Sequence, residues 1–302
     1  MIKISELKEI KATTTTNILT PQKTLSPSSI NTYYKCPRSY FYSYLAKIRM
    51  MPNIHLIKGS IVHEALEKFF NKYVENFVGS MEKCYEKAME KNAKSIRNLE
   101  LKEAELTQFT TDIKFILEEY VINFTRKIGA LIHSEKAENK AHAWFLLRPK
   151  FREIYVKDDD LHCCGYIDRV TTDFDGILTI GDYKTSSKYG IGFPMDYKRQ
   201  LSIYSLLYLN QEKRCPDFAG VIFLRYGEVY LLEVTPSLLR YARDTILDVY
   251  GKTRSTVFKD YPKKEGGLCR WCSYKDICSG NDDWIEKLRH QKFKEIIKKE
   301  GK

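Results

Sequence analysis

The stretch GYIDRVTTDFDGILTIGDYK, residues 165–184, decides how this chain folds. Apolar and β-branched residues mark two strand-like runs on either side of residues 173–176, and Asp-Gly is a strong signal for a two-residue hairpin turn. If the runs pair across that turn, Asp168 and Asp182 lie near the same rung, to within about one residue. Asp182 and Lys184 are two apart on one strand and therefore share a face. The stretch predicts a β-hairpin that gathers two carboxylates and a lysine on one patch.

This patch has the composition of a metal-dependent hydrolytic site. Carboxylates are hard ligands for Mg²⁺ or Mn²⁺, and such an ion activates water and polarises a phosphodiester. Lys184 would orient that water or offset charge on the phosphate, and His63 would add an imidazole that suits Mn²⁺ at least as well as Mg²⁺. Singly, each residue has an ordinary explanation as a capping, solvated or packed side chain. Glu153, on the preceding strand, is either a supporting carboxylate or a solvated strand position.

The remaining sequence predicts an α+β fold: a small mixed sheet flanked by helices, with a helical insertion at residues 80–135. One helix begins at Ser26 and Pro27 and carries Cys36. A second follows residues 59–60 and holds His63 in its first turn. Expected strands are 144–147, 151–156, 162–171, 177–184, 221–226 and 229–234, and further helices are 196–209, 237–250 and 283–299.

Four of the eight cysteines form a candidate metal site. Cys269, Cys272 and Cys278 follow one another closely, and Cys36 is the best candidate for a fourth ligand. Four thiolates hold either Zn²⁺ or an iron–sulfur cluster, and the residues alone leave both open. Either occupant would fasten the two ends of the chain together. Cys84 and Cys215 have no ligand spacing and are assigned to packing or surface. The adjacent Cys163 and Cys164 face opposite sides of a strand, with one expected in the core and the other half-exposed.

Bulk properties set the context for these sites. The formal net charge of +11 favours a polyanionic partner such as DNA or RNA, although a basic surface without special purpose fits the charge equally well. No segment resembles a signal peptide or is long enough to span a bilayer, so we expect a cytoplasmic protein without membrane contact. The expected organisation is a polar lead-in at 1–25, one domain at 26–282 with the cysteine segment at 266–280, and a basic helix at 283–302.

With the hairpin, the upstream histidine and the cysteine frame, the chain resembles the RecB-like branch of the PD-(D/E)XK nuclease superfamily. Within it, the chain is similar to the iron–sulfur members, such as the AddB nuclease domain and CRISPR-associated RecB-like exonucleases. The resemblance covers residues 26–60 in outline, His63, residues 155–208 and residues 268–279, and leaves out the intervening helices.

The resemblance implies a role for each matching residue. His63, Asp168 and Asp182 match the metal ligands, together with the backbone carbonyl of Tyr183. Lys184 matches the lysine of the (D/E)-x-K pair, and Gln200 and Tyr204, on one helix face, match residues that contact DNA near the scissile phosphate. The four cysteines match the ligands of a 4Fe–4S cluster, which tips the choice away from zinc.

We therefore expect a Mg²⁺- or Mn²⁺-dependent deoxyribonuclease, acting as an exonuclease on single-stranded DNA or on DNA ends in repair, recombination or CRISPR adaptation. The alternative is a non-catalytic scaffold subunit that binds DNA ends for a helicase or integrase. The chain has no Gly-x-x-x-x-Gly-Lys-Ser/Thr phosphate loop, so any helicase motor would be a separate subunit.

Overall fold

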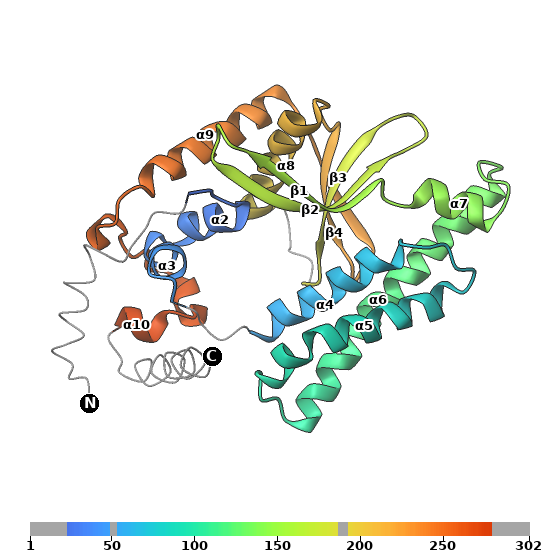
Figure 1. Cartoon of the computed structure of the whole chain (residues 1–302), viewed down its shortest axis with the longest axis horizontal. Coiled ribbons are helices and arrows are strands. Elements are labelled where there is room, and N and C mark those ends of the chain that lie inside the picture. Colours follow the sequence, from blue (N-terminus) through green and yellow to red (C-terminus); the bar gives the residue numbers. More distant parts are fainter. Residues whose placement is uncertain (1–22, 49–52, 187–192, 280–302) are drawn as a thin grey trace, which may run out of the picture. The chain divides into compact units, whose positions relative to one another are not determined.

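The computed structural model describes residues 23–48, 53–186 and 193–279 (Figure 1). Its centre is a five-stranded mixed sheet in the order β1-β2-β3-β4-β5. Only β3 and β4 run parallel among the described strands, and helix α8 connects them. The α+β class expected from the sequence is confirmed. The strands are β1 (Phe151–Asp158), β2 (Cys163–Thr172), β3 (Leu178–Lys184), β4 (Phe218–Phe223) and β5 (Glu228–Glu233).

The β2–β3 hairpin forms where the sequence predicted it, but its turn is longer. The ladder pairs Thr172 with Leu178, which leaves five residues in the loop instead of two. The side chain of Asp173 accepts hydrogen bonds from the backbone N–H groups of Asp175 and Ile177 at 3.0 and 2.9 Å. This side-chain closure competes with a tight Asp-Gly turn. Gly176, with φ of +79°, supplies the left-handed residue that the longer loop requires.

Helices cover the two faces of the sheet differently. Helix α8 (Met195–Glu212) packs against β1, β2, β3 and β4, and α9 (Pro236–Lys252) packs on α8. Lys184 and Asp182 contact α8, so strand alternation directs Tyr183 to the other face. There Tyr183 joins the large apolar cluster of the helical insertion. Neighbouring residues on β3 therefore contact different helical layers, α8 on one face of the sheet and the helical insertion on the other.

Helices α5 (Phe77–Arg97) and α6 (Glu103–His133) form the insertion predicted at residues 80–135. Because α4 (Ile54–Phe69) and α7 (Lys140–Leu147) border it, the name helical insertion covers all four helices from here on. The apolar side chains that recur along α6 at helical spacing, from Phe109 to Ile128, are buried in this cluster. Helix α4 starts earlier than predicted because Asn53 caps it, accepting from Leu56 N at 2.9 Å. His63 therefore lies in the middle of α4 and not in its first turn.

One predicted strand is a helix. Residues 144–147 form the end of α7, which Asn139 caps by accepting from His142 N at 2.9 Å. A four-residue apolar run does not distinguish a strand from a buried helix turn. Here the Asn139 cap starts a helix that continues through the run. The predicted helix at 283–299 and the first 22 residues of the lead-in lie outside the described residues. None of the helices that the structure describes is long and apolar enough to cross a membrane.

The chain divides into two compact units. Unit 2 comprises Lys23–Asn31 and Met51–Lys252 and includes the sheet and the helical insertion. Unit 1 comprises Met1–Gln22, Thr32–Met50 and Thr253–Lys302, of which the structure describes residues 32–48 and 253–279. Cys36 follows the end of α2 (Pro27–Lys35) and precedes α3 (Pro37–Tyr40), instead of lying within a helix as predicted. The short elements of unit 1 are η1 (Phe41–Leu45), η2 (Phe258–Asp260), η3 (Gly267–Trp271) and α10 (Lys275–Ser279).

Candidate active site and cysteine cluster

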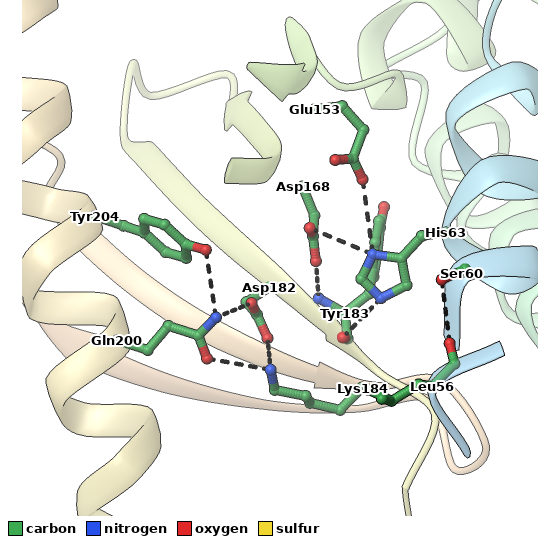
Figure 2. A network of polar contacts seen from close by, with 10 residues as sticks. All are labelled: Leu56, Ser60, His63, Glu153, Asp168, Asp182, Tyr183, Lys184, Gln200 and Tyr204. Carbon is green, nitrogen blue, oxygen red and sulfur yellow. Dashed lines mark hydrogen bonds and ion pairs between the residues drawn. The ribbon is translucent and has the colours of Figure 1, made fainter. Parts of the chain in front are cut away.

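The two aspartates lie where the β2–β3 ladder ends. The last pair on the site side is Arg169 with Gly181, so Asp168 and Asp182 occupy the next rung, as the hairpin predicted. No backbone pair forms there, because Asp168 Oδ2 accepts the Tyr183 backbone N–H at 2.6 Å (Figure 2). Ile167 and Asp168 are both buried, which breaks the alternation of β2 at this point. The strands separate locally and leave the carboxylates available to ligands.

His63 reaches this point from α4 in the helical insertion. Its Nδ1 lies 3.4 Å from Asp168 Oδ1 and 3.6 Å from Glu153 Oε1. Its Nε2 lies 3.1 Å from the Tyr183 carbonyl oxygen (Figure 2). Ligand atoms of His63, Glu153 and Asp168 all lie within 4.8 Å of one another. Among the residues that the structure describes, this is the one such group of three or more.

Glu153 is the member of this group that sequence reasoning undervalued. It lies opposite Asp168 on β1, and the pair is missing from an otherwise continuous ladder. Its backbone φ of +46° is left-handed, which is uncommon for a residue other than glycine. No local sequence signal marks this residue, because its position opposite Asp168 depends on the register that pairs Phe151 with Val170.

Asp182, Lys184, Gln200 and Tyr204 form a second polar network beside the first (Figure 2). Lys184 Nζ lies 2.5 Å from Asp182 Oδ2 and donates to Gln200 Oε1 at 3.1 Å. Gln200 Nε2 donates to Asp182 Oδ1 at 2.8 Å and to the Tyr204 hydroxyl at 3.4 Å. Gln200 therefore fixes both members of the Asp-x-Lys pair. Gln200 and Tyr204 share a face of α8, as their spacing predicted.

The charges of the site shift the pKa values of its groups. Burial lowers the pKa of His63, but the charge of Asp168 and hydrogen bonds to Asp168 and Glu153 outweigh it and raise this pKa to about 10. Burial raises the pKa of Asp182 to about 6, with Lys184 opposing the shift and Asp168 adding to it. Burial alone would lower the pKa of Lys184, but the Asp182 carboxylate raises it. The site thus favours positive charge among its carboxylates.

The donor set fits a divalent cation. His63 offers an imidazole nitrogen, Glu153 and Asp168 offer carboxylates, and the carbonyl oxygen of Tyr183 lies alongside. Asp182 Oδ2 is buried and accepts no hydrogen bond of good geometry, even though the Lys184 ammonium lies close by. Oxygen-rich sites with one imidazole suit Mg²⁺ and Mn²⁺. The predicted ligands His63, Asp168 and Tyr183 converge, whereas Asp182 pairs first with Lys184.

The four predicted cluster cysteines all belong to unit 1. The Lys264 backbone N–H donates to Cys36 Sγ at 3.4 Å, and Cys269 Sγ donates to the Lys264 carbonyl at 3.8 Å. Burial raises the pKa of Cys272, and the charges of Cys36, Cys278 and Cys269 raise it further, so the thiols are electrostatic neighbours. All eight cysteines are free thiols. The segments around Cys36 and Cys269 therefore meet within one unit.

A comparison with protein-family profiles identifies the family of this chain. The profile described as PD-(D/E)XK nuclease superfamily matches residues 24–279. A crystal structure of an Eubacterium rectale protein, described as a "putative exonuclease", is 13% identical with a TM-score of 0.47 over 91% of this chain and 93% of that one. At that distance it adds nothing to the assignment. No curated protein matches. Because the profile covers most of the chain, including both the sheet and the cysteine segment, the protein belongs to the PD-(D/E)XK nuclease superfamily.

Proposed function

We propose that this nuclease is a Mg²⁺- or Mn²⁺-dependent deoxyribonuclease whose metal is held by His63, Glu153 and Asp168. The observation that carries the proposal is the convergence of these three ligand atoms within 4.8 Å, beside the Asp182–Lys184 pair. A non-catalytic scaffold has no need of a complete donor set with a lysine fixed next to it. Asp182 and the Tyr183 carbonyl complete the proposed coordination.

The residues of the chain divide the chemistry between them. A divalent ion held there would polarise the phosphodiester and lower the pKa of a water. Lys184, fixed by Asp182 and Gln200, presents its ammonium where charge develops on the phosphate or where the attacking water must be oriented. Gln200 and Tyr204 hold this arrangement from α8, and we assign them the contact with the strand next to the scissile bond.

Cleavage is the first test of this proposal. End-labelled single-stranded DNA is incubated with the full-length protein and Mn²⁺, Mg²⁺ or a chelator, in parallel with Lys184→Ala. We expect degradation that requires metal and is lost by at least about 100-fold in the variant, the scale of one oriented electrostatic group. Binding without cleavage under every metal would favour the alternative, a scaffold that presents DNA ends to a separate helicase or integrase.

An exposed tyrosine pair supports a single-stranded substrate. Tyr155 and Tyr166 are cross-strand partners on β1 and β2, with exposures of 44% and 56% and ring centroids 5.0 Å apart. Each lies two residues along its strand from a proposed metal ligand, a distance of about 7 Å. Exposed aromatic rings bind unpaired bases by stacking. We therefore assign this pair the contact with the bases of a strand that leaves the active site.

This part of the proposal has its own test. In the Lys184→Ala background, with chelator present, Tyr166→Ala should weaken binding of single-stranded DNA by about tenfold, the effect of losing one stacked base. Duplex binding should change little. Tyr226→Ala, which removes a ring of similar exposure at the β4–β5 turn, is the control. Equal losses of affinity in Tyr166→Ala and Tyr226→Ala, or for duplex and single-stranded DNA, would contradict the binding of unpaired bases by the tyrosine pair. Polarity of digestion from labelled ends then tests the exonuclease assignment.

We further propose that Cys36, Cys269, Cys272 and Cys278 hold a 4Fe–4S cluster. What supports the proposal is the order and spacing of the four cysteines, together with the meeting of the Cys36 and Cys269 segments within unit 1. Four thiolates also suit Zn²⁺, so the metal content decides between the two occupants. Protein purified without oxygen should show broad visible absorption and contain iron and sulfide. Colourless protein that contains one zinc per chain would contradict this proposal.

A further inference from the structure

A cavity lies on the face of the sheet opposite α8. Helix α6 lines it with Tyr120, Asn123, Phe124 and Lys127, and the sheet side contributes Arg169 together with apolar side chains and the turn at Gly227. Its volume is about 80 Å³. One water needs about 10–15 Å³ of such space, so the cavity has room for a small polyatomic ion. None of the proposed metal ligands lines it.

The polar lining of this cavity is cationic. Arg169 is half-buried, and its Nε is fully buried without a hydrogen-bond partner. Lys127 is exposed, which places its charge towards solvent, and partial burial together with the charge of Arg169 lowers its pKa. In the part of the chain that the structure describes, no carboxylate forms an ion pair with either residue. Two like charges therefore share one cavity without an internal counter-ion.

Arg169 is not explained by packing alone. It hydrogen-bonds to Tyr183, whose hydroxyl lies 3.5 Å from that of Tyr120. Neutral hydroxyl groups do not balance a guanidinium charge, and a buried donor without a partner is costly. A Cβ atom added to Gly227 would lie 2.5 Å from Asn123 Nδ2, so the glycine leaves space for this amide at the cavity. Guanidinium, ammonium and amide groups are together the donors that recognise oxyanions.

We propose that this cavity binds a tetrahedral oxyanion, a phosphate group, between Arg169, Lys127 and Asn123. Arg169 follows Asp168 directly, and the ring of Tyr183 lies on the cavity side while its backbone contacts the metal-binding group. The phosphate site is therefore behind the active site and separate from it. The phosphate comes either from free inorganic phosphate or from the 5′-phosphate of a nucleotide or strand end. The inference does not depend on whether the protein cleaves DNA.

Calorimetric titration of the metal-free full-length protein with inorganic phosphate, at constant ionic strength, tests the site. We expect saturable binding that weakens at least about tenfold in Lys127→Gln, as expected for the loss of one charge-assisted contact. Because Lys127 and Arg169 repel each other, Lys127→Gln should keep or raise the melting temperature without ligand. Arg169→Gln should also lose phosphate binding, but this substitution removes the hydrogen bond to Tyr183 as well and so alters the fold around the cavity. Lys127→Gln is therefore the decisive variant.

Two controls locate the bound anion. Lys94→Gln removes an exposed lysine of α5 and should leave the affinity unchanged. Lys184→Ala removes the cation of the active site and should also leave it unchanged. Titration with a 5′-mononucleotide and a 5′-phosphorylated oligonucleotide then distinguishes the two sources of phosphate. The proposal is overturned if phosphate does not bind, if Lys127→Gln binds as well as the wild type, or if Lys184→Ala abolishes binding.

Discussion

Glu153 shows how a single residue adapts to the site. Its left-handed backbone costs on the order of 1–2 kcal/mol, and its carboxylate directly faces that of Asp168 across the strands. Both costs are tolerated because His63 lies between the carboxylates and places a positive charge there. Strain kept in this way by surrounding packing is typical of ligand-binding positions.

Substitution of Glu153 separates its backbone from its carboxylate. Glu153→Gln should lower Mn²⁺ affinity by about 10–100-fold, because the site loses one charged donor. Glu153→Gly should lower affinity similarly but lose little stability, since glycine adopts φ of +46° without strain. Calorimetric Mn²⁺ binding and thermal unfolding measure the two effects. A Glu153→Gln variant with unchanged affinity would exclude this carboxylate from the metal site.

The sequence placed some site residues well and others poorly. Asp168, Asp182 and Lys184 followed from the hairpin signal and the strand periodicity to within about one residue, although the loop is longer than the predicted two-residue turn. The local sequence around Glu153 has no such signal. Its relation to Asp168 arises only after β1 pairs with β2, and its left-handed φ is a tertiary effect. The metal-binding and catalytic roles of these residues stay predictions.

At the scale of elements, one carboxylate joins the helical insertion to the sheet. Asp112 on α6 forms ion pairs with Lys58 on α4, at 2.5 Å, and with Arg225 after β4. Partial burial would raise the pKa of Asp112, but hydrogen bonds from Lys58 and Arg225 lower it overall. Because α4 carries His63, this junction helps to hold the histidine over the strands that carry its partners.

The junction predicts a pH-dependent loss of stability. Asp112→Asn should lower the free energy of unfolding at neutral pH by about 1–3 kcal/mol. The folded pKa of Asp112 lies below its unfolded value of about 3.9, so the stabilisation is present above that value and is lost as the pH falls through the folded pKa. Urea unfolding should therefore show the difference from wild type closing below about pH 4. Glu118→Gln, exposed on the same helix, should show no such convergence.

Element boundaries depended on side-chain caps that a hydrophobic pattern does not reveal. Asn53 starts α4 well before residues 59–60, and Asn139 turns residues 144–147 into helix. The long stripe of α6 was predictable, because its apolar period extends over many turns. The cysteines indicated that the two ends of the chain meet, but not that these ends form a unit of their own beside the sheet and the helical insertion.

At the scale of the whole molecule, the two units predict separable stabilities. Unit 1 is held by its own contacts, such as Arg38 Nε donating to the Tyr261 carbonyl at 2.6 Å and Ser43 bonded to Tyr274 at 2.8 Å. The proposed cluster would add to these, whereas the metal site belongs wholly to unit 2. Losing the cluster should therefore affect unit 1 first.

Cys269→Ser tests this separation. The variant should lose the visible absorption of the cluster and melt its unit at lower temperature, while Mn²⁺ affinity at the His63 group stays within about twofold of wild type. Cys215→Ser, which alters an exposed thiol of unit 2, should change neither quantity. Loss of absorption in both variants, or retention in Cys269→Ser, would contradict the assignment of the four cysteines.

The composition of unit 1 also sets an order of events during protein synthesis. Residues 32–48 leave the ribosome first, but their partners begin at Thr253, after all of the sheet and the helical insertion. At about 5–20 residues per second, translation separates the two by on the order of ten seconds or more. Unit 2 is synthesised in that interval and ends at Lys252, ahead of Cys269, while Cys36 emerges long before both. A nascent chain thus has the means to complete its nuclease core before the thiols that would accept an inorganic cofactor are all present.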